Sequence, residues 1–268
     1  MPRRWRLICD GAASGAWNMG VDEALLESVR AGGDPILRLY RWNGPWLSIG
    51  YGQRPGAARL CACREAGVGV VRRATGGAAV LHGGDLTYAV AAREEVVPGG
   101  LQASYRRITE ILSSALAALG VDTQRVVRGA PDPRARDFDC FAEPAPDELC
   151  VGGRKLLGSA QRRAAGAFLQ HGSLRVVPDA ASAAGAAGLA ADRATSLVEQ
   201  GYEGGFEPLC RAIVRAAGTG LDAVFQGGPL AETERALARE RCAAHALDPL
   251  APPPGLPRDA SRERMDDR

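Results

Sequence analysis

One segment of the chain combines a cysteine with residues that could activate it. Residues 139–149, DCFAEPAPDEL, begin with Asp139-Cys140 and follow a charged, proline-bearing stretch. A thiol becomes a strong nucleophile when a cation lowers its pKa, and a thiolate readily attacks a thioester. We expect Lys155 to lie across a hairpin from this segment and to supply that cation. Chemistry alone does not single out Cys140, because the chain has seven cysteines and an ordinary loop or core cysteine is the commoner case.

A second segment, residues 72–90 (RRATGGAAVLHGGDLTYAV), has the composition of a ligand-binding loop followed by a strand. Glycines such as Gly76 and Gly77 let the backbone approach a ligand closely, and exposed N–H groups there can hold a carbonyl or phosphate oxygen. Arg72 or Arg73 can add charge-assisted hydrogen bonds to the same group. A tight turn between strands with solvated arginines explains the same pattern. This segment by itself therefore leaves both interpretations open.

A third segment, residues 153–163 (GRKLLGSAQRR), places Lys155 shortly before three small residues, Gly158-Ser159-Ala160. Small residues in a strand are expected where an extended chain must lie against the backbone. The sequence FLQHGSL at 168–174 repeats this small, polar character. A lone lysine at a hairpin is usually a surface charge, but packing alone does not explain both runs of small residues.

Hydrophobic periodicity and turn residues predict the elements that must position these segments. Residues 14–31 predict a helix that starts at Ser14 and stops at Gly32-Gly33. Strands are expected at 36–42 and 46–52, joined as a hairpin by the turn residues 43–45. The other expected elements are a short helix at 56–66, strand segments within 68–90, a helix at 101–119, a loop at 128–139, short strands at 149–151 and 155–157 around Gly152-Gly153, a strand at 167–177, and helices at 180–195, 206–218 and 229–246.

This order of elements predicts an α/β protein of the α+β type. It mixes antiparallel pairs with long helices, which favours mixed, largely antiparallel sheets flanked by helices over a doubly wound parallel sheet. The chain lacks a G-x-G-x-x-G after its first strand, so a Rossmann site is not expected. We expect one catalytic domain at 1–248 and a disordered tail at 249–268, which is rich in proline and then in charge.

Composition excludes several classes of partner and site. A net charge of +2 from 33 basic and 31 acidic residues provides no general field for nucleic acid. The apolar runs are shorter than the ~20 residues needed to cross a bilayer, and no apolar h-region follows the N-terminal arginines. We therefore expect a cytoplasmic protein without nucleic-acid or membrane partners. The irregular cysteine spacing predicts reduced thiols, and the spacing of Cys61 and Cys63 does not fit a zinc or redox motif, so no metal site is expected.

Together the three segments resemble the biotin/lipoate ligase and octanoyltransferase family, specifically its cysteine-dependent octanoyltransferase branch, which is related in sequence to lipoate–protein ligase A. The motifs are RR-x-TGG-x-AVLH with D-L-T-Y, then CF-x-x-P-x-x-x-E-L, then GRK-x-x-GSAQ-R and LQHGS, in the family's order. The resemblance runs from about Trp5 to about Cys242. It implies the catalytic-domain fold of the biotin/lipoate protein ligases.

The resemblance also implies an acyltransferase of protein lipoylation that needs no cofactor. Cys140 would take octanoyl from octanoyl-acyl carrier protein as a thioester, with Lys155 lowering the pKa of the thiol and handling the proton. The acyl group would pass to a lysine of the glycine-cleavage H protein or of a lipoyl domain of a 2-oxoacid dehydrogenase complex. The expected substrate-binding residues are Arg72, Arg73, Thr75, Gly76, Gly77, His82, Thr87, Tyr88, Gly158, Ser159, Ala160, Gln161, His171 and Gly172.

Three other functions fit the same motifs. An ATP-dependent lipoate–protein ligase would use the Arg-Gly-Gly and lysine segments to make an acyl-adenylate, would need ATP and Mg, and here would lack the usual C-terminal domain. An amidotransferase would move the acyl group from H protein to a lipoyl domain through the same cysteine. A non-catalytic acyl-binding module would need neither Cys140 nor Lys155, so their joint presence argues against it.

Overall fold

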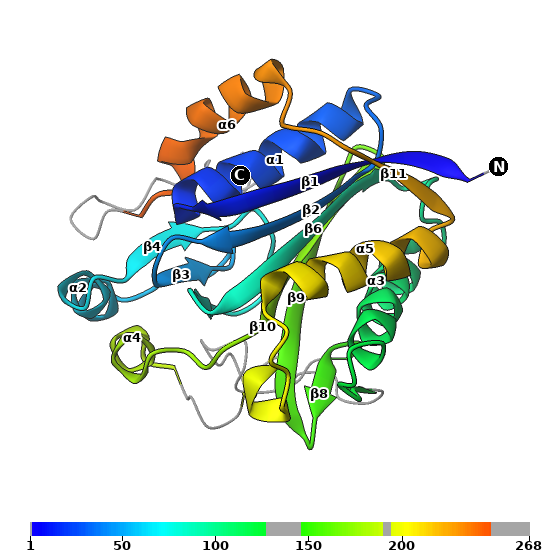
Figure 1. The fold of residues 1–268 in the computed structure, drawn as a ribbon. Coiled ribbons are helices and arrows are strands. Elements are labelled where there is room, and N and C mark those ends of the chain that lie inside the picture. Colours follow the sequence, from blue (N-terminus) through cyan, green and yellow to red (C-terminus); the bar gives the residue numbers. More distant parts are fainter. Residues whose placement is uncertain (1, 127–145, 190–193, 248–268) are drawn as a thin grey trace, which may run out of the picture.

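The computed structural model describes residues 2–126, 146–189 and 194–247, which form a mixed α/β fold built on two sheets (Figure 1). The larger sheet has eight strands in the order β11-β1-β2-β6-β10-β9-β8-β7, and the smaller has the order β4-β3-β5. The strands are β1 Arg3–Ala13, β2 Ile36–Trp42, β3 Trp46–Ile49, β4 Gly69–Arg72, β5 Val80–His82, β6 Asp85–Arg93, β7 Gln124–Arg125, β8 Leu149–Val151, β9 Arg154–Ala164, β10 Ala167–Arg175 and β11 Ala223–Gly227.

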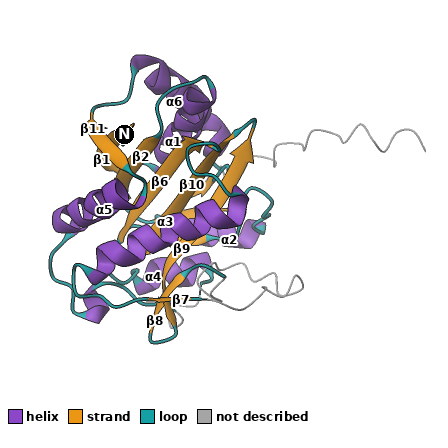
Figure 2. Ribbon diagram, turned by 90° about the vertical axis from the view of Figure 1, so that its right-hand side faces the viewer, coloured by secondary structure: helices purple, strands orange, loops and turns teal. Residues whose placement is uncertain are grey.

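The helices cover both faces of the larger sheet (Figure 2). Helices α1 and α6 pack together on one face, and α3 and α5 pack together on the other. The helices are α1 Gly15–Arg30, α2 Ala57–Glu65, α3 Gly100–Ala117, α4 Ala181–Ala187, α5 Phe206–Gly220 and α6 Glu232–His245, with a 3-10 turn at Val198–Gln200. The sheet is parallel at β11-β1-β2 and antiparallel from β2 to β7. The predicted fold class is therefore confirmed.

The first helix shows how local features of the sequence set the start and the end of a helix. The side chain of Ser14 accepts a hydrogen bond from the backbone N–H of Trp17 at 3.3 Å, which caps the start of α1. The chain leaves the helix through Gly32, whose φ of +97° is a conformation that glycine adopts without strain. One face of α1 buries Val21, Leu25 and its other apolar residues against the sheet, so cap, stop and periodicity agree.

The predicted hairpin at 36–42 and 46–52 is wrong. Strand β2 pairs with β1 and β6 in the larger sheet, whereas β3 pairs with β4 and β5 in the smaller one. Turn residues 43–45 carry the chain from one sheet to the other instead of reversing it within one sheet. Both strands are almost fully buried, so each needed a partner on either side, and sequence alone does not identify those partners.

The strands β1, β7 and β11 were also not expected, and one helix is shorter than expected. Strand β1 alternates apolar positions with arginine and other polar residues, and β11 is mostly exposed, so neither has a strong apolar signature. Their parallel pairing places β11 at the edge of the sheet beside β1. Among the described residues of the helix expected at 180–195, only Ala181–Ala187 form an α-helix. The expected loop at 128–139 and tail at 249–268 lie outside the described residues.

The described helices include none with the length and apolar character of a membrane span.

Candidate active site

A narrow cavity of about 40 Å³ lies where the larger sheet, the smaller sheet and α1 meet. This is room for a few water molecules. Its walls combine aromatic and small residues with a few buried polar groups, as binding sites commonly do. The lining residues are Met19, Tyr40, Trp42, Ser48, Arg73, Gly77, Val80, His82, Thr87, Gly158, Ser159, Ala160, His171, Gly172 and Ser173.

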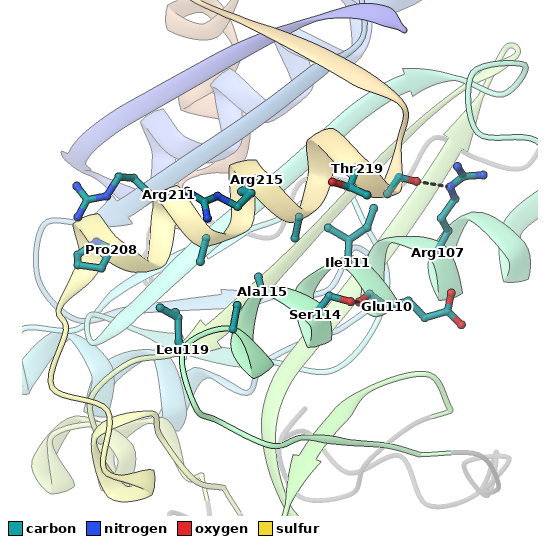
Figure 3. Close-up of a pocket in the computed structure, with 14 residues that line it drawn as sticks. Arg107, Glu110, Ile111, Ser114, Ala115, Leu119, Pro208, Arg211, Arg215 and Thr219 are labelled. Carbon is teal, nitrogen blue, oxygen red and sulfur yellow. Dashed lines mark hydrogen bonds between the residues drawn. The ribbon is translucent and has the colours of Figure 1, made fainter.

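A larger, open hollow of about 680 Å³ lies between α3 and α5 (Figure 3). Its floor includes Ile111 and Ala115, and the guanidinium of Arg107 donates a hydrogen bond to the carbonyl of Gly220 at 2.8 Å across one end. The residues expected to bind substrate gather in the narrow cavity instead. Size alone therefore does not mark the functional site of this chain.

Arg73 holds the glycine loop against the smaller sheet. Its guanidinium donates to the carbonyls of Ser48, Gly76 and Ala78 at 2.7–3.2 Å and is almost fully buried. A Cβ built on Gly50 would lie only 2.0 Å from the carbonyl oxygen of Gly77, so the two segments touch backbone to backbone. The glycines therefore allow this close approach and let Arg73 reach the cavity wall.

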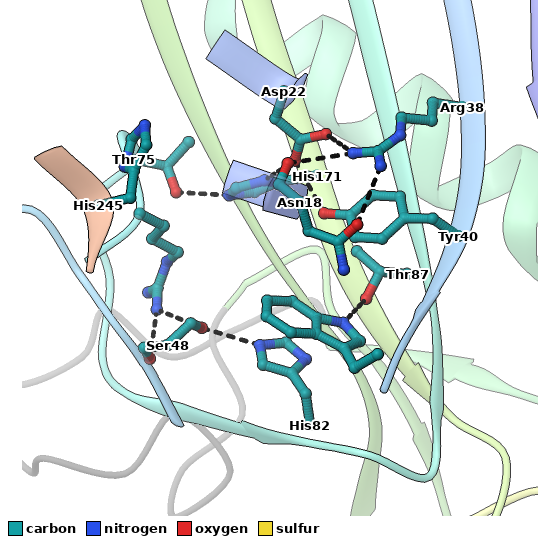
Figure 4. A network of polar contacts seen from close by, with 12 residues as sticks. Asn18, Asp22, Arg38, Tyr40, Ser48, Thr75, His82, Thr87, His171 and His245 are labelled. Carbon is teal, nitrogen blue, oxygen red and sulfur yellow. Dashed lines mark hydrogen bonds and ion pairs between the residues drawn. The ribbon is translucent and has the colours of Figure 1, made fainter. Parts of the chain in front are cut away.

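A chain of polar groups passes through His82, and we call Ser48, His82 and Asp85 the His82 relay. Figure 4 shows its link between Ser48 and His82. The hydroxyl of Ser48 lies 2.8 Å from His82 Nε2, and His82 Nδ1 lies 2.8 Å from Asp85 Oδ2. Asp85 also accepts hydrogen bonds from the hydroxyls of Thr87 and Ser173 and from a backbone N–H. Burial alone would raise the pKa of the Asp85 carboxyl, but these bonds and His82 outweigh it and leave the pKa below its usual value.

A second chain of the same kind passes through His171, and we call Thr75, His171 and Asp22 the His171 relay. Thr75 Oγ1 lies 2.7 Å from His171 Nε2, and His171 Nδ1 lies 2.8 Å from Asp22 Oδ2 (Figure 4). Asp22 also forms an ion pair with Arg38 and accepts the hydroxyl of Tyr40, both at 2.8 Å. Burial alone would raise the pKa of Asp22, but His171 and Arg38 outweigh it and lower that pKa.

The wall formed by β9 and β10 has its own polar network. Tyr88 and Ser159 share a hydrogen bond of 2.8 Å, and Gln170 donates to the Tyr88 oxygen at 2.9 Å and accepts from Gln161 at 2.8 Å. Burial raises the pKa of Tyr88 to about 12. A Cβ on Gly172 would lie 2.5 Å from both Ser159 Oγ and the Tyr88 ring, so this wall requires glycine there.

Lys155 is buried and paired rather than a surface charge. Its Nζ lies 2.6 Å from Glu148 Oε2, with the two side chains 1% and 3% exposed. Its backbone bridges to Ala194, which packs against the cavity residue Val80. The backbone of Lys155 is therefore connected to the cavity wall through Ala194 and Val80. Cys140 lies outside the described residues.

The thiol of Cys150 is affected by the charges of the same ion pair, Lys155 and Glu148. Burial raises the pKa of the Cys150 thiol, the charge of Glu148 raises it further, and the charge of Lys155 lowers it only in part. Cys150 is therefore a poor thiolate, and it is a useful control for Cys140.

The model of the lipoyl protein ligase A/B catalytic domain matches residues 14–208 of this chain. The chain belongs to that family. The match spans α1, both relays and the Lys155–Glu148 pair, so the family's catalytic domain contains the candidate site described above.

Curated relatives of the family carry the name Octanoyltransferase LipM. The chain is 45% identical over 181 residues to the one from Symbiobacterium thermophilum, covering 65% of this chain and 66% of the relative. It is 42% identical over 183 residues to the one from Staphylococcus aureus, with coverage of 65% and 66%. The chain thus aligns with just under two thirds of the length of these relatives.

Solved structures share the fold of the lipoyl protein ligase catalytic domain. A lipoate-protein ligase A bound with ATP superposes with a TM-score of 0.75 at 25% identity, covering 91% of this chain and 95% of that one. A T. acidophilum protein assigned as a lipoate protein ligase and solved with lipoic acid gives a TM-score of 0.71 at 25% identity, with coverage of 90% and 94%.

Most of the substrate-binding residues that the sequence predicted lie at the narrow cavity. Arg73, Gly77, His82, Thr87, Gly158, Ser159, Ala160, His171 and Gly172 line it.

The other marked residues lie behind the wall or turn away. Thr75, Tyr88 and Gln161 bond to residues of the wall or of the network behind it, and Gly76 accepts from Arg73. Arg72 instead donates to the carbonyls of Gly50, Tyr51 and Gln53 at 2.7–3.2 Å, so it supports a loop.

Sequence reasoning missed several residues of the site. Glu148 stood within the quoted C-F…E-L motif but received no role, although a buried lysine requires a partner. Asp85 begins the quoted D-L-T-Y motif but received no role, and Asp22 lies inside α1, where acids are usually solvated. The further cavity residues that were not expected are Met19, Tyr40, Trp42, Ser48, Val80 and Ser173.

Proposed function

We propose that this protein transfers an octanoyl group from octanoyl-acyl carrier protein to a lysine of the glycine-cleavage H protein or of a lipoyl domain, through a thioester on Cys140. The observation that carries the proposal is the 45% identity to a relative named as an octanoyltransferase. The narrow cavity, lined by glycines and aromatic side chains, supports it as a place for an unbranched acyl chain.

The transfer proceeds in two balanced steps. The Cys140 thiolate attacks the carbonyl of the carrier thioester, the C–S bond to the carrier breaks, and the carrier thiolate takes up a proton. The amine of the acceptor lysine then attacks the Cys140 thioester, an amide forms, and the Cys140 thiolate is released while the amine loses a proton. Lys155 favours the thiolate and stabilises it on release.

The ion pair between Lys155 and Glu148 supports this role for the lysine. A lysine that is 1% exposed would tend to lose its proton without a nearby anion, and the Glu148 carboxylate at 2.6 Å favours the ammonium form. A cation next to a thiol lowers the pKa of that thiol. We therefore assign Glu148 the task of keeping Lys155 charged.

Intact-mass analysis tests the proposal. We expect the full chain mixed with octanoyl-acyl carrier protein, without ATP, to gain the mass of one octanoyl group. The adduct should vanish in Cys140→Ser and persist in Cys150→Ser, the matched control. An acceptor that becomes acylated only with ATP, and still does so in Cys140→Ser, would overturn the thioester and favour the ATP-dependent ligase.

The ligase remains the second candidate because a structural relative of similar fold binds ATP. The amidotransferase is distinguished by the donor, since octanoylated H protein would then replace octanoyl-acyl carrier protein in forming the adduct.

A separate variant tests the role of Lys155. Lys155→Ala should slow adduct formation near neutral pH and recover part of the rate at higher pH, where the thiol ionises unaided. A rate without pH recovery would mean that Lys155 positions the substrate instead.

A further inference from the structure

The His82 relay places a serine, a histidine and an aspartate in the order used for nucleophilic catalysis, and the proposed cysteine mechanism leaves it unused. The two links, Ser48 Oγ to His82 Nε2 and His82 Nδ1 to Asp85 Oδ2, are both 2.8 Å. Ser48 and His82 line the cavity. A nucleophile, its base and the group that orients the base are therefore in hydrogen-bond contact on the wall of the site.

The hydrogen bonds around Asp85 fix where the protons lie. Asp85 accepts from the backbone N–H of Gly83 and from the hydroxyls of Thr87 and Ser173, so it is an ionised carboxylate with only acceptor capacity. His82 must then donate from Nδ1. In the neutral imidazole, Nε2 is the acceptor for the Ser48 hydroxyl. This is the tautomer that a general base for Ser48 requires.

Neighbouring groups hold the relay and favour its charged states. The ring of Trp42 stacks on His82 with centroids 3.9 Å apart and planes at 11°, which fixes the imidazole. Nη1 of Arg73 lies 3.3 Å from Ser48 Oγ, so a positive charge faces the oxygen that becomes negative as it loses its proton. The Asp85 carboxylate stabilises the imidazolium that forms at the same time.

A chain of neighbouring residues also connects Ser48 to Lys155. Ser48 pairs with Val80 across β3 and β5, and Val80 packs on Ala194, which bridges to Lys155. In the proposed transfer the reacting carbonyl lies near Lys155. Ser48 therefore belongs to the part of the cavity wall that connects to Lys155.

We propose that Ser48 is a second nucleophile and gives this protein a hydrolase activity on medium-chain acyl thioesters and activated acyl esters. The inference rests on the proposed function only in that the cavity takes an acyl chain. Ser48 Oγ bonds to the acyl carbon as its proton passes to His82, the bond to the thiolate or alkoxide leaving group breaks, and that group takes the proton. Water, deprotonated by His82, then attacks the Ser48 ester, the acid leaves and Ser48 regains its proton.

The test uses the full chain carrying Cys140→Ala, which removes the proposed thioester nucleophile, and p-nitrophenyl octanoate as the probe. We expect measurable release of p-nitrophenolate, reduced about 100-fold or more by Ser48→Ala or His82→Ala in the same background. The matched control Ser114→Ala, an exposed serine on α3 whose hydroxyl bonds only within its helix, should leave the rate unchanged. Hydrolysis that is absent, or that Ser48→Ala leaves intact, overturns the inference.

A trapping experiment avoids the need for a folded variant. A fluorophosphonate with an octyl chain should label the unsubstituted protein, and peptide mapping should place the label on Ser48. A label confined to other residues overturns the inference. The outcomes separate the two proposals, because failure of the Cys140 adduct leaves the Ser48 result standing, and failure of Ser48 labelling leaves the Cys140 adduct standing.

Discussion

The His82 relay and the His171 relay contain the same sequence of groups, a hydroxyl, an imidazole and a carboxylate, but their carboxylates have different surroundings. Asp22 in the His171 relay forms an ion pair with Arg38 at 2.8 Å and accepts a phenol hydroxyl. Among the described residues, Asp85 in the His82 relay forms no ion pair with a lysine or arginine and is held by hydroxyls and a backbone N–H. One carboxylate is charge-compensated, and the other keeps its charge for its histidine.

This difference assigns the two relays different tasks. In the His171 relay, the cation of Arg38 already neutralises much of the charge of the Asp22 carboxylate. This relay therefore mainly connects α1 to β2 and β10. The hydroxyls around Asp85 are neutral, so the charge that develops on His82 during a proton transfer has a full counter-charge beside it. Similar geometry therefore supports a structural task in one place and a chemical task in the other.

The largest expected effect comes from removing the compensating charge. Arg38→Met leaves Asp22 buried without its cation, and we expect the free energy of unfolding to fall by about 3–5 kcal/mol. Urea titration monitored by tryptophan fluorescence measures it. The control is Arg211→Met, which breaks an exposed ion pair and should cost at most about 1 kcal/mol. Equal losses in the two variants would show that Arg38 is not essential to the His171 relay.

The next effect concerns pH and Asp85. Its pKa is lower in the folded protein than in an unfolded chain, so its contribution is present above the unfolded value of about 3.9 and is lost as pH falls through the folded pKa. Asp85→Asn should cost about 1–3 kcal/mol at neutral pH. It should also make stability fall less steeply below about pH 4.

Urea midpoints measured across that pH range check this prediction. An unchanged acid slope in Asp85→Asn would mean that Asp85 does not carry the charge assigned to it. Because Asp22 also has a lowered pKa, part of the acid sensitivity should remain in the variant.

The sequence predicted most helices and strands because their signals are local. Ser14 caps α1 by a contact three residues away, and Gly152-Gly153 turns β8 into β9. The prediction of a hairpin at 36–52 was wrong because turn residues indicate that the chain changes direction but do not indicate which sheet the next strand joins. Strand β1 was missed because polar residues interrupt its apolar pattern, and its parallel partners lie far away in sequence.

The site was predictable only in part for a related reason. The glycine and small-residue runs mark places where chains approach closely, so Gly77, Gly158 and Gly172 were found and line the cavity. Ser48 was missed because its partner His82 is 34 residues away, and an isolated serine in a strand carries no signal. The functional roles of Cys140 and Lys155 remain proposals that rest on the family motifs.

Tyr40, another residue that the sequence did not mark, gives the smallest and sharpest contrast between the relays. Its hydroxyl donates to Asp22 at 2.8 Å, and burial followed by the charge of Asp22 raises the pKa of this phenol well above its usual value. Tyr40→Phe should cost only about 1 kcal/mol in urea unfolding, because Asp22 keeps Arg38 and His171. Hydrolysis of p-nitrophenyl octanoate should change less than about 3-fold, since the hydroxyl belongs to the compensated relay. A loss of hydrolysis as large as that of Ser48→Ala would show that the two relays act as one unit.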